Sequence, residues 1–104
     1  MTERAQRPKF KRIVFKPSGE ALAGDSGKGL DGATLEATAK EIIDLRQNLN
    51  VDVAVVVGGG NFWRGREGSM TGMDATQSDH IGMLGTVMNA LALQDALERQ
   101  GQET

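Results

Sequence analysis

Two short segments of the sequence combine groups that suit phosphate binding. Lys16-Pro17-Ser18-Gly19 offers an ammonium and a hydroxyl, and Gly58-Gly59-Gly60-Asn61 offers backbone N–H groups with no side chains in the way. Glycine lets a backbone approach an anion closely, and successive N–H groups form an anion-binding nest. Arg64 follows Gly60 by four residues and can add a bidentate guanidinium. The chemistry predicted from these residues is recognition of a phosphate group.

Each of these features also has a structural explanation when it is taken alone. A triple glycine after a strand is often only a tight turn. Lys16 can be an exposed strand end, and Arg64 a solvated loop residue. Phosphate binding gains weight only if both segments lie on one rim, where charge and backbone donors converge.

The surrounding sequence alternates strand and helix patterns. Strands are predicted at 12–16 and 51–57, and amphipathic helices at 33–49, with Asp31 as N-cap, and at 78–99. This order favours an α/β domain with parallel strands. Because ligands of such sheets bind at the carboxyl ends of the strands, both glycine-containing segments are expected on the same rim.

The second strand indicates a covered sheet. Residues 53–57 are all apolar without alternation, which is typical of a strand buried on both faces in a parallel sheet with helices on each side. Two strands and two helices are few for such a sheet. We therefore expect residues 12–104 to be the N-terminal part of a larger domain, preceded by a flexible basic leader at 1–11. Such a chain alone should be marginally stable, because it leaves an apolar sheet edge.

Composition excludes several kinds of site. The 104 residues include no Cys and one His, which rules out disulfides, thiolate zinc sites and multi-His metal sites. No apolar run approaches the roughly 20 residues of a membrane helix, and no secretory signal is present. The basic leader suggests nucleic-acid binding as an alternative, but it lacks interleaved aromatic residues for base stacking. We expect a cytoplasmic chain that binds neither membrane nor nucleic acid.

Two common phosphate motifs are absent. The glycine-rich segment 24–29 has Gly29 after Lys28, where a P-loop needs Ser or Thr. A dinucleotide fingerprint starting at Gly58 would need glycine at its sixth position, which is Trp63. A standard P-loop enzyme and a standard Rossmann dehydrogenase are therefore disfavoured.

The second predicted helix carries unusual residues near its start. Asp79 either stabilises the helix N-terminus or accepts hydrogen bonds from sugar hydroxyls. Gly82 and Gly85 each cost about 1 kcal/mol relative to alanine inside a helix. A backbone or a ligand is therefore expected to approach this face, and helix packing explains the two glycines equally well.

Three segments together resemble the bacterial uridylate kinase (UMP kinase) family of the amino acid kinase superfamily. They are Lys16-Pro17-Ser18-Gly19-Glu20-Ala21-Leu22, Val57-Gly58-Gly59-Gly60-Asn61-Phe62-Trp63-Arg64-Gly65 and Ser78-Asp79-His80-Ile81-Gly82-Met83-Leu84-Gly85-Thr86-Val87-Met88-Asn89. The first two patterns occur widely in the superfamily. The third indicates the uridylate branch rather than acetylglutamate or aspartate kinases.

The resemblance implies phosphoryl transfer from ATP to UMP with Mg²⁺, giving ADP and UDP. The ATP-binding residues would be Lys16, Pro17, Ser18, Gly19, Gly60 and Arg64. Lys16 and Arg64 would also be the catalytic residues that balance transition-state charge, and Gly59 and Asp79 would bind UMP, with Asp79 on the ribose. The loop linked to GTP activation would be Gly24, Asp25, Ser26, Gly27, Lys28 and Gly29. The family is typically hexameric and inhibited by UTP, and no metal ligand is expected in this segment.

Two departures from the family pattern bear on these expectations. Pro17 stands where members usually carry Leu, and it removes one backbone donor from the loop. Family members also continue well beyond this length, and their C-terminal half supplies the adenine pocket and further catalytic groups. Two alternatives stay open: a superfamily kinase acting on a carboxylate or carbamate, and a nucleotide-binding module without catalysis.

Overall fold

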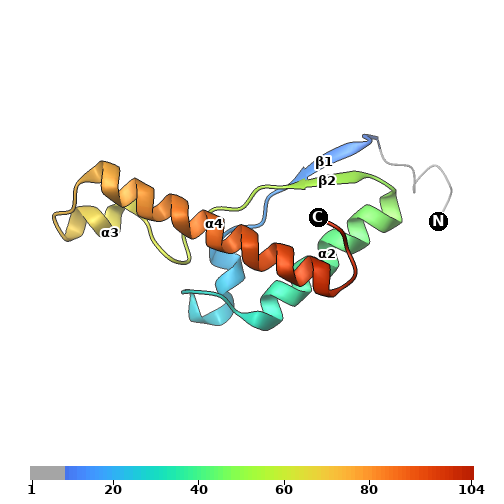
Figure 1. Ribbon diagram of the computed structural model, residues 1–104, viewed down its shortest axis with the longest axis horizontal. Helices are drawn as coiled ribbons and strands as arrows, with labels where there is room; N and C mark the ends of the chain where they lie inside the picture. Colours follow the sequence, from blue (N-terminus) through green and yellow to red (C-terminus); the bar gives the residue numbers. More distant parts are fainter. Residues whose placement is uncertain (1–8) are drawn as a thin grey trace.

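The structure is a computed structural model that describes residues 9–104, except for the side chains at positions 65, 66 and 69. Most of the predicted basic leader therefore lies outside the described residues. The elements are β1 (Arg12–Phe15), the 3₁₀ helix η1 (Glu20–Ser26), α2 (Gly32–Leu49), β2 (Asp52–Val55), α3 (Gly65–Met70) and α4 (Ala75–Arg99). Figure 1 shows the long α4 running beneath the two strands and past them to α3.

The two strands pair in parallel, as predicted. Arg12 lies opposite Asp52 and Phe15 opposite Val55. The backbone N–H of Val56 continues the ladder by donating to the carbonyl of Phe15, at 3.0 Å. The carboxyl ends of both strands therefore open onto the same rim.

Helix α2 has a recognisable capping residue at each end. The carboxylate of Asp31 accepts hydrogen bonds from the hydroxyl of Thr34, at 2.6 Å, and from its backbone N–H, at 2.9 Å. These bonds favour the charged form and lower the pKa of Asp31. The helix ends at Asn50, whose φ of 52° is left-handed. The predicted N-cap is confirmed, and the helix starts within one residue of the predicted position.

The core lies between the helices and one face of the sheet. Its buried residues are Leu22, Leu35, Ala39, Ile42, Ile43, Val57, Leu93, Ala96 and Leu97. Phe15, Val53 and Val55 pack against this core from the strands. Val14 and Val56 point the other way and are 68% and 48% exposed.

The predicted double-sided burial of residues 51–57 is therefore wrong for the described part of the chain. The regular strand is only Asp52–Val55, and exposed and half-buried residues alternate along it. The physical reason is that α2 and α4 pack on the same face, so that the opposite face has no covering layer among the described residues. The parallel sheet with packed helices is confirmed.

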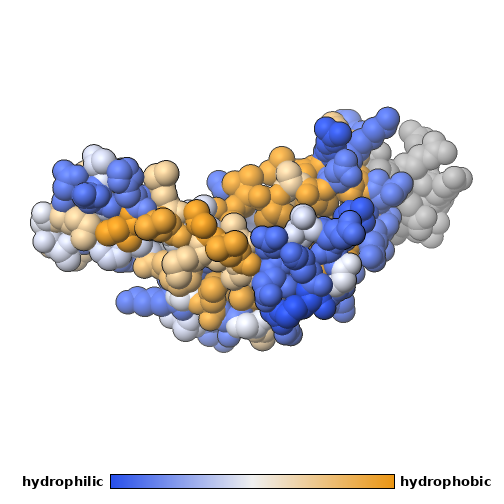
Figure 2. All heavy atoms as spheres, viewed as in Figure 1, coloured by the Kyte–Doolittle hydropathy of each residue, from blue (hydrophilic) through white to orange (hydrophobic). Residues whose placement is uncertain are grey.

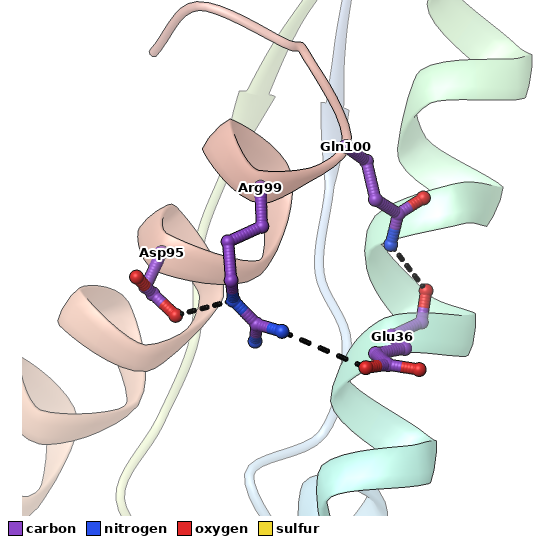
Figure 3. A network of polar contacts seen from close by, with 4 residues as sticks. All are labelled: Glu36, Asp95, Arg99 and Gln100. Atoms are coloured by element: carbon purple, nitrogen blue, oxygen red, sulfur yellow. Dashed lines mark hydrogen bonds and ion pairs between the residues drawn. The ribbon is translucent and has the colours of Figure 1, made fainter.

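A polar network ties the end of α4 to α2 (Figure 3). Arg99 pairs with Asp95 on its own helix at 2.7 Å and with Glu36 of α2 at 3.6 Å. The hydrogen bond that Arg99 donates to Asp95, together with the negative charge of that carboxylate, raises the pKa of Arg99, with a smaller contribution from Glu36. The side chain of Gln100 donates to the backbone carbonyl of Glu36 at 3.0 Å.

Three element boundaries differ from the sequence prediction. Helix α4 starts at Ala75, because the carboxylate of Asp74 caps it by accepting from the N–H of Gln77 at 3.1 Å. Asp79 therefore lies within the helix rather than at its start. The chain also forms the short helix α3 between the predicted strand at 51–57 and the predicted helix at 78–99, and the glycine-rich segment at 24–29 begins inside η1.

Candidate functional site

The two glycine-containing segments meet at the end of the sheet. A Cβ placed on Gly19 would lie 2.8 Å from the carbonyl oxygen of Gly58 and 3.1 Å from Oδ1 of Asn61. Only glycine fits such a contact, so Gly19 lets the Lys16–Gly19 segment lie directly against the Gly58–Asn61 turn. The predicted common rim is confirmed.

The glycine turn also packs on the backbone of α4. A Cβ on Gly59 would lie 2.6 Å from the carbonyl oxygen of Gly82 and 2.7 Å from the nitrogen of Thr86. A Cβ on Gly85 would in turn lie 3.3 Å from the carbonyl oxygen of Gly59. Of the two glycines expected to mark a close approach on this helix, Gly85 therefore admits the Gly59 backbone. Gly82 is not crowded in this way, because a Cβ there would make only an ordinary contact of 3.9 Å with the carbonyl oxygen of Trp63.

The turn directs its carbonyls inward and leaves N–H groups available. The carbonyl of Gly59 accepts from the N–H groups of Phe62 and Trp63, at 3.0 and 3.1 Å. Within residues 9–104, the N–H groups of Gly59 and Gly60 donate to no hydrogen bond. Gly59 is nevertheless a buried residue. A buried donor without a partner is rare in folded proteins and is suited to an anion.

A buried pair of asparagines holds this turn in place. Asn89 of α4 is fully buried and Asn61 is 3% exposed. Each side-chain amide donates to the other, at 3.0 Å from Asn61 and 2.7 Å from Asn89. Asn89 also donates to the carbonyl of Gly58 at 2.6 Å, and Asn61 donates to the carbonyl of Gly29 at 2.7 Å.

Arg64 lies beside the turn and pairs with Glu20 of η1. A Cβ on Gly60 would lie 3.7 Å from Nε of Arg64 and 3.6 Å from a carboxylate oxygen of Glu20. The two side chains are 37% and 54% exposed, so solvent and ligands can reach them. The sequence suggested no role for Glu20, and the one available signal was its position directly after Gly19.

The remaining residues expected at the ATP side lie on the Lys16–Gly19 segment. Lys16 is exposed and follows β1, Pro17 is half-buried, and the hydroxyl of Ser18 accepts from the N–H of Glu20 at 3.2 Å. The carbonyls of Ser18 and Gly19 start η1 by accepting from the N–H groups of Ala21 and Leu22, at 3.0 and 3.2 Å. This segment therefore has a defined conformation, and the Lys16 ammonium stays in solvent.

A polar cleft of about 430 Å³ joins this site to the segment at 24–29. Its lining includes Gly60, Arg64 and Glu20 of this site together with Gly24, Gly27 and Lys28. The hydroxyl of Ser26 steadies the segment by donating to the carbonyls of Ala23 and Lys28, at 2.8 and 2.9 Å. Asp25 is exposed.

Asp79 is not in hydrogen-bonding contact with the turn. It is exposed on α4, three residues before Gly82, and residues so spaced share a helix face. Asp79 therefore lies about one turn beyond the point where Gly59 approaches α4. Its neighbour Ser78 accepts a hydrogen bond from the indole N–H of Trp63 at 2.9 Å, which anchors the segment after the turn to the same end of α4.

The part of the chain that the structure describes holds no group of three or more His, Cys, Asp or Glu residues arranged for a metal ion. No helix of that part is long and apolar enough to cross a membrane.

Residues 11–104 match the model of the Amino acid kinase family. The chain belongs to this family. It is 55% identical over 96 residues to a uridylate kinase of Pediococcus pentosaceus, a match that covers 92% of this chain and 39% of the relative. The resemblance inferred from the three sequence segments is thus confirmed.

Solved structures of the family superpose on the same region. The UMP kinase of Bacillus anthracis matches with a TM-score of 0.80 and 39% identity, over 86% of this chain and 36% of that one. The UMP kinase of Ureaplasma parvum matches with a TM-score of 0.78 and 34% identity, over 88% of this chain and 39% of that one. The chain thus spans less than two fifths of the length of these relatives and carries part of their fold.

Proposed function

We propose that this protein is a UMP kinase, which transfers the γ-phosphoryl group of ATP to UMP and forms ADP and UDP. The observation that carries the proposal is the meeting of the Lys16–Gly19 segment with the Gly58–Asn61 turn. There, the N–H groups of Gly59 and Gly60 have no partner among the described residues, and Gly60 lies near the cation of Arg64. The 55% identity to a uridylate kinase supports UMP as the acceptor.

Phosphoryl transfer depends on positioning and charge stabilisation more than on covalent chemistry. In the proposed mechanism, Gly60 and the segment Lys16-Pro17-Ser18-Gly19 bind the phosphates of ATP. Gly59 and Asp79 hold UMP, with the Asp79 carboxylate accepting from ribose hydroxyls. Lys16 and Arg64 balance the negative charge that is shared between the two substrates in the transition state.

Arg64 must change partners to act in this way. Its guanidinium pairs with the Glu20 carboxylate, and in the proposed mechanism a phosphate oxygen replaces that carboxylate. Exposed ion pairs contribute only about 0–1 kcal/mol, so a phosphate can displace the carboxylate at little cost.

We propose that Mg²⁺ enters with the ATP phosphates. The carboxylates that line the polar cleft beside the turn are Glu20, which is paired with Arg64, and Glu67, which is exposed. These two groups do not form a cage for the ion within the described residues, since Mg²⁺ prefers several oxygen ligands in octahedral geometry. When bound, Mg²⁺ would neutralise charge on the transferring phosphates.

Regulation and assembly are further parts of the proposal. The segment Gly24–Gly29 is proposed as the loop through which GTP activates, because it shares the polar cleft with Gly60 and Arg64. UTP is proposed as the inhibitor, a homohexamer as the assembled form, and the cytoplasm as the location. Exposed apolar side chains along α4, seen as orange spheres in Figure 2, support self-association.

A substrate panel tests the function. The intact protein is supplied with ATP and Mg²⁺ together with UMP, acetylglutamate, aspartate or carbamate, and ADP release is measured. The proposal predicts ADP release with UMP and none above background with the others. Release with a carboxylate or with carbamate alone would assign a different kinase activity of the family. Binding of ATP and UMP without ADP release would favour a binding module without catalysis.

A further inference from the structure

The N–H group of Gly59 is oriented by a residue that is distant in sequence. Asn89 donates its side-chain amide to the carbonyl of Gly58 at 2.6 Å, from a position in α4 with no solvent exposure. The carbonyl of Gly58 and the N–H of Gly59 belong to the same peptide unit, which is trans. In a trans peptide these two groups point in opposite directions. Holding the carbonyl toward Asn89 therefore turns the Gly59 N–H away from it.

The hydrogen bond from Asn89 restrains the peptide between Gly58 and Gly59, which the glycine residues themselves restrain little. Gly58, Gly59 and Gly60 each tolerate a wide range of backbone angles, so the peptide between two of them can rotate. The carbonyl of Gly58 accepts no backbone hydrogen bond within the described residues. The amide of Asn89 is thus its hydrogen-bond partner, and Asn61 fixes that amide from the other side.

We propose that Asn89 is a positioning residue that keeps the Gly59 N–H turned toward the phosphate of the substrate. The inference rests on the proposed function, because it assigns the donor that this function uses. Asn89 does not contact the phosphate itself. It acts through the Gly58–Gly59 peptide.

The asparagine pair offers a matched comparison of variants. Asn89→Ala removes the donor to Gly58. Asn61→Ala removes the same kind of buried side chain but leaves Asn89 free to donate to the Gly58 carbonyl. Asn89→Asp and Asn61→Asp form a second pair that preserves shape. Both add a carboxylate near the turn, but only Asn89→Asp loses the donor to Gly58.

The experiment uses the intact protein labelled with ¹⁵N-glycine and titrated with inorganic pyrophosphate. In the wild type, the Gly59 amide resonance should shift on titration. In Asn89→Ala, the shift should be lost and pyrophosphate binding weakened about tenfold more than in Asn61→Ala, which corresponds to about 1.4 kcal/mol. The aspartate pair should show the same difference, and circular dichroism should show helix content in every variant compared.

Two results would overturn the inference. One is a wild-type Gly59 resonance that does not shift when pyrophosphate is added. This result would overturn the inference even if an Asn89 variant fails to fold. The other is equal weakening by the two members of a folded pair. UMP phosphorylation without a Gly59 response would refute this inference alone. A Gly59 response in a protein that does not phosphorylate UMP would instead refute the proposed function and leave an anion site held by Asn89.

Discussion

Two cations at the rim of the sheet carry the charge stabilisation in the proposed reaction. Lys16 is exposed at the end of β1, and Arg64 is held beside Gly60 by its exchangeable pair with Glu20. They approach the glycine turn from different segments.

Replacing either cation should therefore reduce turnover strongly. We predict that Lys16→Ala and Arg64→Ala each lower kcat by at least about a hundredfold, the loss typical when one donor to a transition state is removed. The measurement is the rate of UDP formation at saturating ATP and UMP. Lys40→Ala, at an exposed position of α2, is the control and should keep wild-type turnover. Near-normal turnover in both variants would contradict the proposed charge-stabilising roles of Lys16 and Arg64.

At this scale the sequence predicted what depends on spacing and missed what depends on tertiary contact. Lys16 and Gly58–Gly60 follow strands, so a parallel sheet necessarily brings them to one rim. The pairing of Asn61 with Asn89, and of Arg64 with Glu20, links segments whose separation leaves no periodic signal. A buried asparagine in a helix looks like any other polar residue until its partner is located.

At the scale of elements, alanine substitutions of Gly59 and Gly82 should change the free energy of unfolding in opposite directions, because the glycine turn contacts α4. A Cβ on Gly59 would lie 2.6 Å from a backbone oxygen of α4, whereas a Cβ on Gly82 would make only an ordinary contact of 3.9 Å with the carbonyl oxygen of Trp63. We predict that Gly59→Ala lowers the free energy of unfolding, because the turn must move off the helix. Gly82→Ala should raise it by up to about 1 kcal/mol through helix propensity.

Urea denaturation measures both effects. The two variants add the same methyl group within one packing interface, so each serves as the control for the other. An unfolding free energy that falls equally in both would contradict the described contact between the turn and the helix.

The N-cap of α2, Asp31, contributes to the free energy of unfolding in a pH-dependent way. Hydrogen bonds from Thr34 lower the pKa of Asp31 in the folded chain below its ordinary value of about 3.9. The carboxylate therefore stabilises the fold at neutral pH, and this contribution is lost as the pH falls through the lowered pKa. Asp31→Ala should unfold more easily than the wild type at pH 7, with the difference shrinking below about pH 4.

Thermal unfolding followed by circular dichroism between pH 3 and pH 7 checks this expectation. Asp44→Ala, at an exposed position within α2, should change the midpoint little across the range. A constant difference between Asp31→Ala and the wild type at every pH would show that the cap acts without its charge.

The element boundaries show where local sequence patterns stop being informative. Asp31 precedes an apolar stripe directly, so its capping role was visible in the sequence. Asp74 caps α4 ahead of a polar first turn, and apolar periodicity alone therefore placed the helix start three residues late, at Ser78. Alternating burial along β2 arises from one-sided packing, which an unbroken apolar run cannot reveal.

At the scale of the whole molecule, apolar surface remains exposed on α4. Met83, Leu84, Val87, Met88 and Leu91 are each about half exposed or more. We predict that Leu84→Lys combined with Leu91→Lys lowers the mass of the assembled protein in solution, because buried charge opposes association. Light scattering after size-exclusion chromatography measures the mass.

Gln94→Lys, on an exposed position of the same helix, is the matched control and should leave the mass unchanged. An assembly that keeps its mass in the double variant would show that α4 does not form the interface.

The family could be predicted from three short segments, and the α/β architecture from the alternation of strand and helix patterns along the chain. The exposed sheet face could not, since exposure depends on which layers cover the strands. Within the described residues, Val14 and Val56 face away from both helices.

The most direct test of the account is a ³¹P NMR experiment on the intact protein with ATP, Mg²⁺ and UMP in one sample. If the protein phosphorylates UMP, UDP and ADP should appear in equal amounts while UMP and ATP disappear together. The same sample containing Lys16→Ala protein should show almost no change over the same time. Loss of ATP without formation of UDP, or no loss of ATP by the wild type, would contradict the assignment of UMP phosphorylation.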